Sequence, residues 1–303
     1  MQTDLVPSYD AVPILKQPKW GWEIALYFFC EGISAGAYLL ATVAEIVGRG
    51  RFRRLSRAGY LTSFATLLPC PPLLIADLGR PERFHHMLRV FKPTSPINLG
   101  AWSLSAFGAA VTATAAHQLL TDGAGGVAGA LGLPFAITMI SYPGVLLATT
   151  STPVWSKSRF LGALMACSSV STGAAASSLV LALSDGNSDS HAALAKIETT
   201  ARVAEGAALV AYVISEGDAA RPLTKGEHKW QFWVGAVALG LIIPSLIARR
   251  STSRTANAIG SALTLAGGFA LKWAITHAGK KSALDNKAAR AATRPSESAP
   301  GWR

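Results

Sequence analysis

The sequence has few of the residues that usually bind metal ions. Only three of its 303 residues are cysteines, and no two of them have the CxxC spacing of a zinc site or an iron–sulfur cluster. Cys30, Cys70 and Cys167 each lie within an apolar run, where cysteine packs as a small apolar side chain. We therefore expect this chain to bind no zinc, no other metal and no iron–sulfur cluster.

Histidines are also scarce, and none lies well inside an apolar run. A haem held within a membrane bundle usually needs facing histidines inside the spans. The six histidines instead fall in loops or near the ends of apolar runs: His85, His86, His117, His191, His228 and His277. We therefore expect no haem, and a haem b cytochrome subunit stays an alternative that an absorption spectrum would decide.

Charged residues make up only 15% of the chain, whereas half of it is hydrophobic. The mean hydropathy of +0.33 is typical of a membrane protein whose charges are concentrated in a few places. The net charge of +11 would suggest nucleic-acid binding in a soluble protein. Here the basic residues gather between apolar runs and in residues 280–303, which suits an anionic lipid surface. We expect contact with membrane lipid and none with nucleic acid.

Eight apolar runs are each long enough, at about 20 residues, to cross a membrane as a helix. They cover residues 22–47, 58–77, 96–119, 127–150, 159–183, 192–214, 230–248 and 256–278. Short connections favour one compact all-α bundle with antiparallel neighbours. We expect an extramembrane segment at 1–20, a membrane domain at 21–278 and a basic, flexible tail at 279–303. Because no apolar run precedes Trp20, the first span is expected to direct the chain to the membrane.

The most distinctive stretch joins the second and third runs, at residues 67–102. Pro69, Pro71 and Pro72 interrupt the second run, and each removes a backbone hydrogen bond and clashes with the preceding turn. The run ends at Asp77. A bend follows whose charged and ionisable side chains are Arg80, Glu82, Arg83, His85 and His86. The sequence predicts a kinked helix that leads into a charged rim, and a plain solvated loop is the alternative.

Ionisable residues inside the apolar runs are candidates for proton transfer. Glu31 lies well within the first run, where a carboxyl group is costly unless it faces a cavity or a partner. In the sixth run, Glu198, Arg202 and Glu205 share one helical face that should turn to the bundle interior or to water. The alternative is that the first turns of this helix lie outside the bilayer, and Glu205 is expected to be the most buried of the three. Lys272 is expected to extend toward the nearer membrane surface.

Four short motifs recur together in one known family. GISAG at 32–36 is a patch of small residues in the first span, and DLGRPERF at 77–84 precedes SPINLGAW at 95–102. In the fourth run, Tyr142 is followed after one residue by Gly-Val-Leu. With these motifs the chain resembles the NrfD family, the membrane subunits of polysulfide-reductase-type complexes (PsrC-like). Pro143 stands where this family usually has threonine.

The resemblance implies a quinone-interacting subunit of a respiratory oxidoreductase complex, with eight helices in two four-helix bundles. Electrons would pass between menaquinone or ubiquinone and a ferredoxin-like iron–sulfur subunit, often joined to a molybdopterin oxidoreductase. The implied quinone-binding residues are Tyr142, Tyr27 and Asp77. The candidates for proton transfer are Glu31, Asp77 and Glu205. The candidates for partner docking are Arg80, Arg83, His85 and His86.

Other functions and the membrane topology stay open at this point. A membrane anchor, or a proton- or ion-translocating subunit without its own quinone site, would also use broken helices. No inverted repeat is visible, however, and transport gives no reason for DLGRPERF. The arginine cluster at 49–57 is expected to be cytoplasmic, which places both termini and the rim on the periplasmic face of a bacterial cytoplasmic membrane. Against this, the face predicted to be periplasmic carries more lysines and arginines than the opposite face when the C-terminal tail is counted.

Overall fold

The computed structural model describes residues 15–48, 50–121, 125–156, 158–183, 188–251 and 253–284. Every regular element in this part of the chain is helical, which confirms the all-α prediction. The long helices are α1 (Trp22–Gly48), α2 (Arg53–Leu67), α4 (Pro96–Thr121), α5 (Gly126–Ala148), α6 (Leu161–Leu183), α7 (Ser188–Glu216) and α10 (Arg254–Ser282). The shorter ones are α3 (Cys70–Ala76), η2 (Pro81–Leu88), η3 (Gly217–Ala220), α8 (Arg221–Thr224), η4 (Gln231–Ile242) and α9 (Ile243–Arg250).

Seven helices in the described ranges are long and apolar enough to cross a membrane. They are α1, α2 with α3, α4, α5, α6, η4 with α9, and α10. The eighth predicted span, residues 192–214, lies in α7, which is long enough but does not meet the same test of apolar composition. The count of eight spans is therefore not confirmed, although seven of the predicted runs are membrane-length helices.

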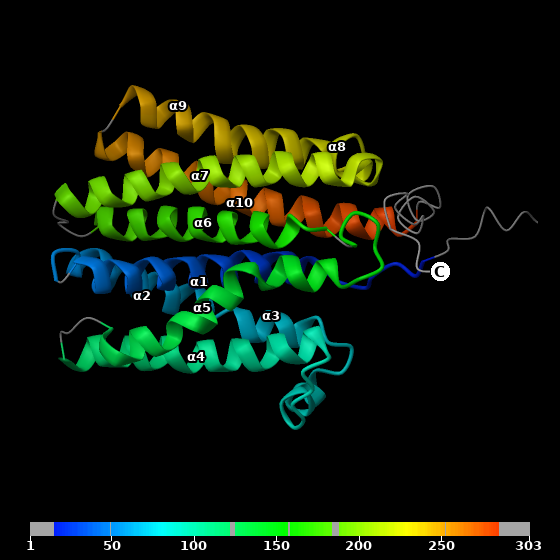
Figure 1. Cartoon of the computed structure of the whole chain (residues 1–303), viewed down its shortest axis with the longest axis horizontal. Helices are drawn as coiled ribbons and strands as arrows, with labels where there is room; N and C mark the ends of the chain where they lie inside the picture. The colour runs from blue at the N-terminus through cyan, green and yellow to red at the C-terminus, as the bar shows by residue number, and fades with distance from the viewer. Residues whose placement is uncertain are drawn as a thin grey trace, which may run out of the picture.

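Helix α7 nevertheless packs in the bundle with its polar face inward. It lies beside α6, and the two helices run antiparallel (Figure 1). Glu198, Arg202 and Glu205 are each no more than 5% exposed, whereas Val203 and Val210 are 66% and 58% exposed. These three charged residues thus lower the hydropathy of α7 without facing outward, as expected for polar groups within a membrane bundle, whereas Lys196 nearer the start of the helix is exposed.

The second span is broken where its prolines predict. Helix α2 ends at Leu67, and α3 begins at Cys70 after a turn. Such a break leaves carbonyl groups without their helical partners. The Cys70 thiol donates to the Thr66 carbonyl across the break, at 3.5 Å. The bend directs α3 toward Asp77, where the charged rim begins.

Helices α1 and α6 join the first half of the chain to the second. A Cβ on Gly36 of α1 would lie 2.0 Å from the Ser169 carbonyl oxygen, and one on Gly173 of α6 would lie 2.5 Å from the Ala37 nitrogen. Glycine at these two positions therefore lets the helices approach backbone to backbone. One continuous hydrophobic core includes residues of both halves. Because the two halves share this core, the expected division into two four-helix bundles is not confirmed.

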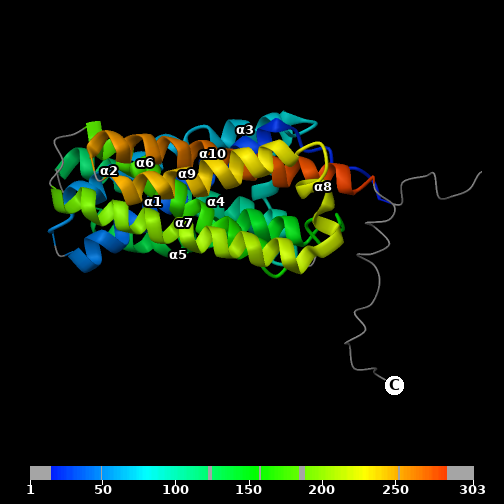
Figure 2. The same cartoon turned by 90° about the horizontal axis from the view of Figure 1, so that it is seen from above.

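The helices run side by side, so the bundle has two distinct ends (Figure 1, Figure 2). The end that we call the rim end holds the start of α1, helix η2 and the end of α10, where Lys280 Nζ donates to the Trp20 carbonyl at 2.6 Å. The opposite end, the arginine end, holds the turn from α1 to α2 and the turn from α9 to α10. Residues 1–14 and 285–303, most of the two predicted extramembrane segments, lie outside the described ranges.

Candidate functional site

Two of the recognised motifs meet at Tyr142. Its phenol group, on α5, donates a hydrogen bond of 3.2 Å to the carbonyl of Pro96, the first residue of α4. A Cβ on Gly100 of α4 would lie 1.9 Å from the Tyr142 hydroxyl oxygen, so only glycine leaves room for the ring there. The SPINLGAW segment therefore both holds and accommodates Tyr142.

Pro143 does not end helix α5, although proline lacks the amide that a helix interior uses. The helix continues to Ala148, and Pro143 is buried within it. Near the proline, the Ser169 hydroxyl of α6 donates to the Ile140 carbonyl at 3.3 Å. Tyr142 therefore keeps a helical position despite the departure from the family pattern.

Tyr27 and Glu31 lie one turn apart on α1 and share the surroundings of Tyr142. Tyr27 is 3% exposed and interacts electrostatically with Glu31 and with Tyr142. Glu31 is fully buried, and neither of its carboxyl oxygens has a hydrogen-bond partner in the described ranges. An unpartnered buried carboxyl group costs stability, so a functional reason for it has to be considered.

Lys272 does not extend to the membrane surface, and the sequence-based expectation for it is wrong. The side chain is fully buried, and its Nζ donates to the Ser168 hydroxyl at 2.8 Å. Its charge interacts with Glu205 and with Glu31. The nearer end of α10 is Ser282, about 15 Å away along the helix at 1.5 Å per residue, so a lysine side chain cannot reach it.

The charged stripe of α7 faces α6 and α10. Arg202 Nη1 pairs with Glu198 Oε1 at 2.6 Å, as the four-residue spacing predicts. Two hydroxyls of α10 also donate to Glu198, from Ser261 at 2.9 Å and from Thr264 at 3.2 Å. Glu205 has a different main electrostatic partner from Glu198, because it interacts chiefly with Lys272. The stripe is thus buried in the bundle and is not a set of solvated first turns.

Asp77 lies at the rim end. Its carboxylate accepts a 2.9 Å hydrogen bond from the Gly21 amide. Burial raises the pKa of Asp77, the Gly21 hydrogen bond and Lys280 oppose this rise, and Glu23 adds to it. Asp77 therefore ties the chain before α1 to the end of α3.

The rim consists of residues 78–95, between α3 and α4. It projects from the bundle near the start of α4 (Figure 1). The four docking candidates are all exposed, and Phe84 and Phe91 beside them are 43% and 59% exposed. The His85 and His86 rings lie edge to face, with centroids 4.4 Å apart. The rim thus offers both cationic and aromatic side chains at the surface.

Asn98, a residue that the sequence analysis missed, fastens the rim to α4. Its side-chain amide donates to the carbonyls of Met87 and Val90 at 2.7 and 2.9 Å. Its oxygen accepts from the Lys92 amide at 2.6 Å. Its position inside the SPINLGAW motif could have identified Asn98 as a functional residue from the sequence. Three hydrogen bonds from one side chain fix the path of the rim.

The structure thus brings Tyr27, Tyr142 and Glu31 into one neighbourhood, with Glu205 joined to it through Lys272. Asp77 contacts the segment before α1 instead. In the described part of the chain, no three side chains of the metal-binding types His, Cys, Asp and Glu gather in one place. This arrangement places two phenols near a carboxyl group, and all three groups can form hydrogen bonds, while the carboxyl group can also exchange a proton.

Comparison with known proteins gives the same family as the motifs. A family model described as polysulphide reductase, NrfD, matches residues 15–282. Protein NrfD of Escherichia coli is 26% identical over 86% of this chain and 95% of its own length. A polysulfide reductase component of Wolinella succinogenes is 33% identical over 29% of this chain and 29% of its own length. A selenate reductase component of Mesobacillus selenatarsenatis is 36% identical over 25% of this chain, and the match spans only 18% of that protein.

The family match covers all of the described helices, which include seven candidate membrane spans. Both observations agree with the family resemblance that the motifs between GISAG and Tyr142 indicate. This chain is therefore a multi-pass membrane protein that belongs to the NrfD family of polysulphide reductase membrane subunits.

Proposed function

We propose that this chain is the quinone-reactive subunit of a respiratory reductase complex in a bacterial cytoplasmic membrane. In this function it exchanges electrons between an iron–sulfur partner at the rim and the membrane quinone pool. The observation that carries the proposal is the grouping of Tyr142, Tyr27 and Glu31 near the rim end. Family membership supports it, because relatives are named as parts of polysulfide and selenate reductases.

The residues present fit a quinone headgroup. Bound quinone supplies two-electron, two-proton redox chemistry at its two carbonyl oxygens. Tyr142 can turn its hydroxyl from the Pro96 carbonyl to such an oxygen, because both are acceptors of the same kind. Glu31 has two oxygens without partners, and so can hold or release a proton beside the tyrosines. Tyr27 completes the polar side of the site from α1.

The rim is proposed as the docking surface for a ferredoxin-like iron–sulfur subunit. Arg80, Arg83, His85 and His86 are exposed there, so their side chains can pair with carboxylates of a partner. Exposed Phe84 and Phe91 add the apolar contacts that interface centres usually contain. A molybdopterin oxidoreductase is proposed beyond that subunit, as the resemblance to polysulfide-reductase-type complexes implies.

We also infer that α7 crosses the membrane as an eighth span, which gives two four-helix groups around the shared core. Its three buried charges support this, as do its outward valines, because a polar face turned inward leaves apolar side chains such as Val203 and Val210 for the lipid. The start of α1 and the end of α10 then lie on one side, with the arginine cluster on the other. The proposed orientation has the rim end periplasmic, following the positive-inside rule.

The substitution Tyr142→Phe tests the proposed site in the intact complex. Loss of one hydrogen bond worth roughly 1 kcal/mol should weaken quinone binding several-fold. Electron transfer to an artificial acceptor and assembly of the complex should be unchanged. Tyr212→Phe is the matched control, because Tyr212 also donates to a backbone carbonyl, that of Val154, at 2.7 Å.

The second candidate function, an anchor without its own quinone site, predicts a different result. Tyr142→Phe and Tyr212→Phe would then have equal and small effects on quinone-linked turnover. That outcome would overturn the proposed site. A larger loss than binding alone explains, in Tyr142→Phe only, would indicate that the phenol also takes part in proton transfer.

A further inference from the structure

We propose that a cavity near the arginine end of the bundle binds the headgroup of an anionic phospholipid, and that an acyl chain of this lipid lies between α7 and α9. The cavity has a volume of about 960 Å³ and is formed by α6, α7, α9 and α10. Neither Tyr142 nor the rim lines it, so this lipid site is separate from the proposed quinone site. The bound lipid would join α7 to the helices at the end of the chain.

The size and the walls of the cavity favour a lipid over a small ion. Pockets that hold small organic ligands have volumes of roughly 300–1,000 Å³, and a phosphate ion would fill only a small part of this one. Apolar side chains form part of its walls: Pro244, Ile247 and Ala248 of α9, and Ala192 and Ala195 of α7. A free ion gives no reason for such walls, whereas a lipid has apolar chains beside its charged headgroup.

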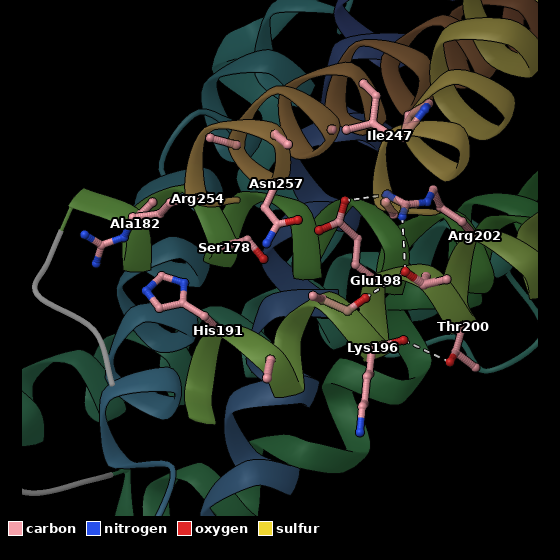
Figure 3. Close-up of a pocket in the computed structure, with 18 residues that line it drawn as sticks. Ser178, Ala182, His191, Lys196, Glu198, Thr200, Arg202, Ile247, Arg254 and Asn257 are labelled. Carbon is pink, nitrogen blue, oxygen red and sulfur yellow. Dashed lines mark hydrogen bonds and ion pairs between the residues drawn. The ribbon is translucent and has the colours of Figure 1, made fainter. Parts of the chain in front are cut away.

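Three polar side chains lie in the part of the cavity nearest the starts of α7 and α10. Figure 3 shows them as His191 of α7 and Arg254 and Asn257 of α10, and we call them the headgroup corner. Both long helices begin at this end of the bundle, α7 at Ser188 and α10 at Arg254 itself. The start of a helix carries partial positive charge, which favours an anion such as phosphate.

The headgroup corner combines positive charge with hydrogen-bond donors. The charge of Arg254 acts on the neighbouring His191. The buried Nε2 atom of His191 has no hydrogen-bond partner in the described ranges, so in the tautomer that carries a proton there it can donate to a phosphate oxygen. The side-chain amide of Asn257 adds a neutral donor. Basic pockets of this kind between membrane helices suit the headgroups of anionic lipids.

Two acidic side chains near this corner are already paired within the protein. Glu198, the one carboxylate among the described lining residues, binds Arg202 at 2.6 Å, as Figure 3 shows, and accepts from two hydroxyls of α10. Asp189, near the start of α7, binds Arg51 at 2.9 Å. Pairing reduces the repulsion that either carboxylate would exert on an anion, so the charge of Arg254 can attract one into the corner.

An apolar track leads from the cavity toward the middle of the bundle. On α9, Ile243 lies one turn before the lining residue Ile247, and on α7, Val203 lies one turn after the lining residue Thr199. Helix α9 ends at the arginine end, where α7 begins, so both turns lead away from that end (Figure 1). Ile243 and Val203 are 37% and 66% exposed. An acyl chain that leaves the headgroup corner can therefore contact apolar side chains of both helices.

The experiment uses the full-length chain, purified in a mild detergent and washed until co-purified lipid is removed. Phosphatidylglycerol, phosphatidylcholine or inorganic phosphate is then added. Native mass spectrometry measures lipid binding, and thermal unfolding in the same detergent measures how much each ligand stabilises the protein. We expect phosphatidylglycerol to bind about tenfold more tightly than phosphatidylcholine, because the choline ammonium group would face Arg254. Inorganic phosphate should stabilise the protein much less, since it makes no contact with the apolar walls.

Arg254→Gln should weaken phosphatidylglycerol binding by about tenfold, through the loss of a charge-assisted hydrogen bond to the headgroup. Arg250→Gln is the matched control, because Arg250 is exposed at the end of α9 and does not line the cavity. Ala248→Phe narrows the cavity from α9 without changing any charge and should weaken binding as much. It keeps the site testable if Arg254→Gln fails to fold.

The possible outcomes separate the lipid site from its alternatives. If Arg254→Gln and Ala248→Phe bind phosphatidylglycerol as tightly as Arg250→Gln does, the lipid binds elsewhere and the proposed site is wrong. If phosphatidylcholine binds as tightly as phosphatidylglycerol, the site does not recognise an anionic headgroup. If inorganic phosphate stabilises the wild type as much as phosphatidylglycerol, the cavity holds a free phosphate ion, and the assignment to lipid fails. Quinone-linked turnover enters none of these measurements, so the proposed function is tested separately.

Discussion

Glu31 and Glu198 are both buried carboxylates in helices of the same bundle, but their surroundings differ. Glu198 pairs with Arg202 and accepts from two hydroxyls of α10. Glu31 has no hydrogen-bond partner in the part of the chain that the structure describes, and its charge is opposed only through Lys272. Complete pairing is typical of a group that stabilises the fold, whereas an unpartnered group has hydrogen-bonding capacity left for a ligand or a proton.

Glu45 makes this comparison sharper because it lies on the same helix as Glu31. Its carboxylate accepts hydrogen bonds from the Gly125 and Gly126 amides at 2.9 and 3.0 Å, and from the Tyr60 hydroxyl at 3.0 Å. It therefore fastens the start of α5 to α1. One helix thus carries a structural carboxylate near the arginine end and a chemically available one nearer the rim end.

The largest expected effect on stability is that of Arg202→Met. The substitution leaves Glu198 buried without its cation, which should lower the free energy of unfolding by about 3–5 kcal/mol. Denaturant titration in detergent micelles, followed by circular dichroism, measures this. Lys281→Met breaks an exposed ion pair and should cost less than about 1 kcal/mol. Equal losses in the two variants would contradict a structural role for the Glu198 pair.

Glu31→Gln should have the opposite pattern. The amide has nearly the same shape, and no hydrogen bond is lost, so the free energy of unfolding should change by less than about 1 kcal/mol. Quinone-linked turnover should fall by about tenfold or more, because glutamine cannot carry a proton. Turnover and unfolding are measured on the same purified complex. Wild-type turnover in this variant would assign Glu31 to packing alone.

Glu45→Gln completes the comparison on α1. The loss of charge-assisted hydrogen bonds to two amides and a phenol should lower the free energy of unfolding by about 1–2 kcal/mol. Quinone-linked turnover should be unchanged when assayed at a temperature where the variant is folded. A turnover defect as large as that of Glu31→Gln would remove the distinction between the two carboxylates.

The smallest expected effect is the pH dependence contributed by Asp77. Burial raises its pKa in the folded protein, so the folded state holds this proton more tightly than the unfolded chain does. Its contribution to stability is therefore present at low pH and is lost as pH rises from about 4 through the raised pKa. Asp77→Asn should flatten the dependence of Tm on pH over this range. Asp218→Asn, which removes a carboxylate from an exposed ion pair with Arg221, is the control.

The sequence by itself determined the helical class, most of the spans and the family. These depend on local properties: a run of about 20 apolar residues forms a membrane helix whatever its neighbours are. The first run, predicted at 22–47, is α1 at Trp22–Gly48, and the third, predicted at 96–119, is α4 at Pro96–Thr121. The prolines before Asp77 likewise predicted the break between α2 and α3, because proline acts within a single turn. The pairing of Glu198 with Arg202 followed from helical spacing alone.

Only the tertiary structure decided which distant residues meet. Tyr142 contacts Pro96 and Gly100, Asp77 accepts from Gly21, and Lys272 interacts electrostatically with both Glu31 and Glu205. Each of these contacts joins different helices or a helix and a distant segment, so it depends on how the helices are rotated and how closely they approach. Hydropathy shows that a helix lies in the membrane but not which face meets which neighbour. For that reason a lysine expected at the surface is in fact buried at the centre of the bundle.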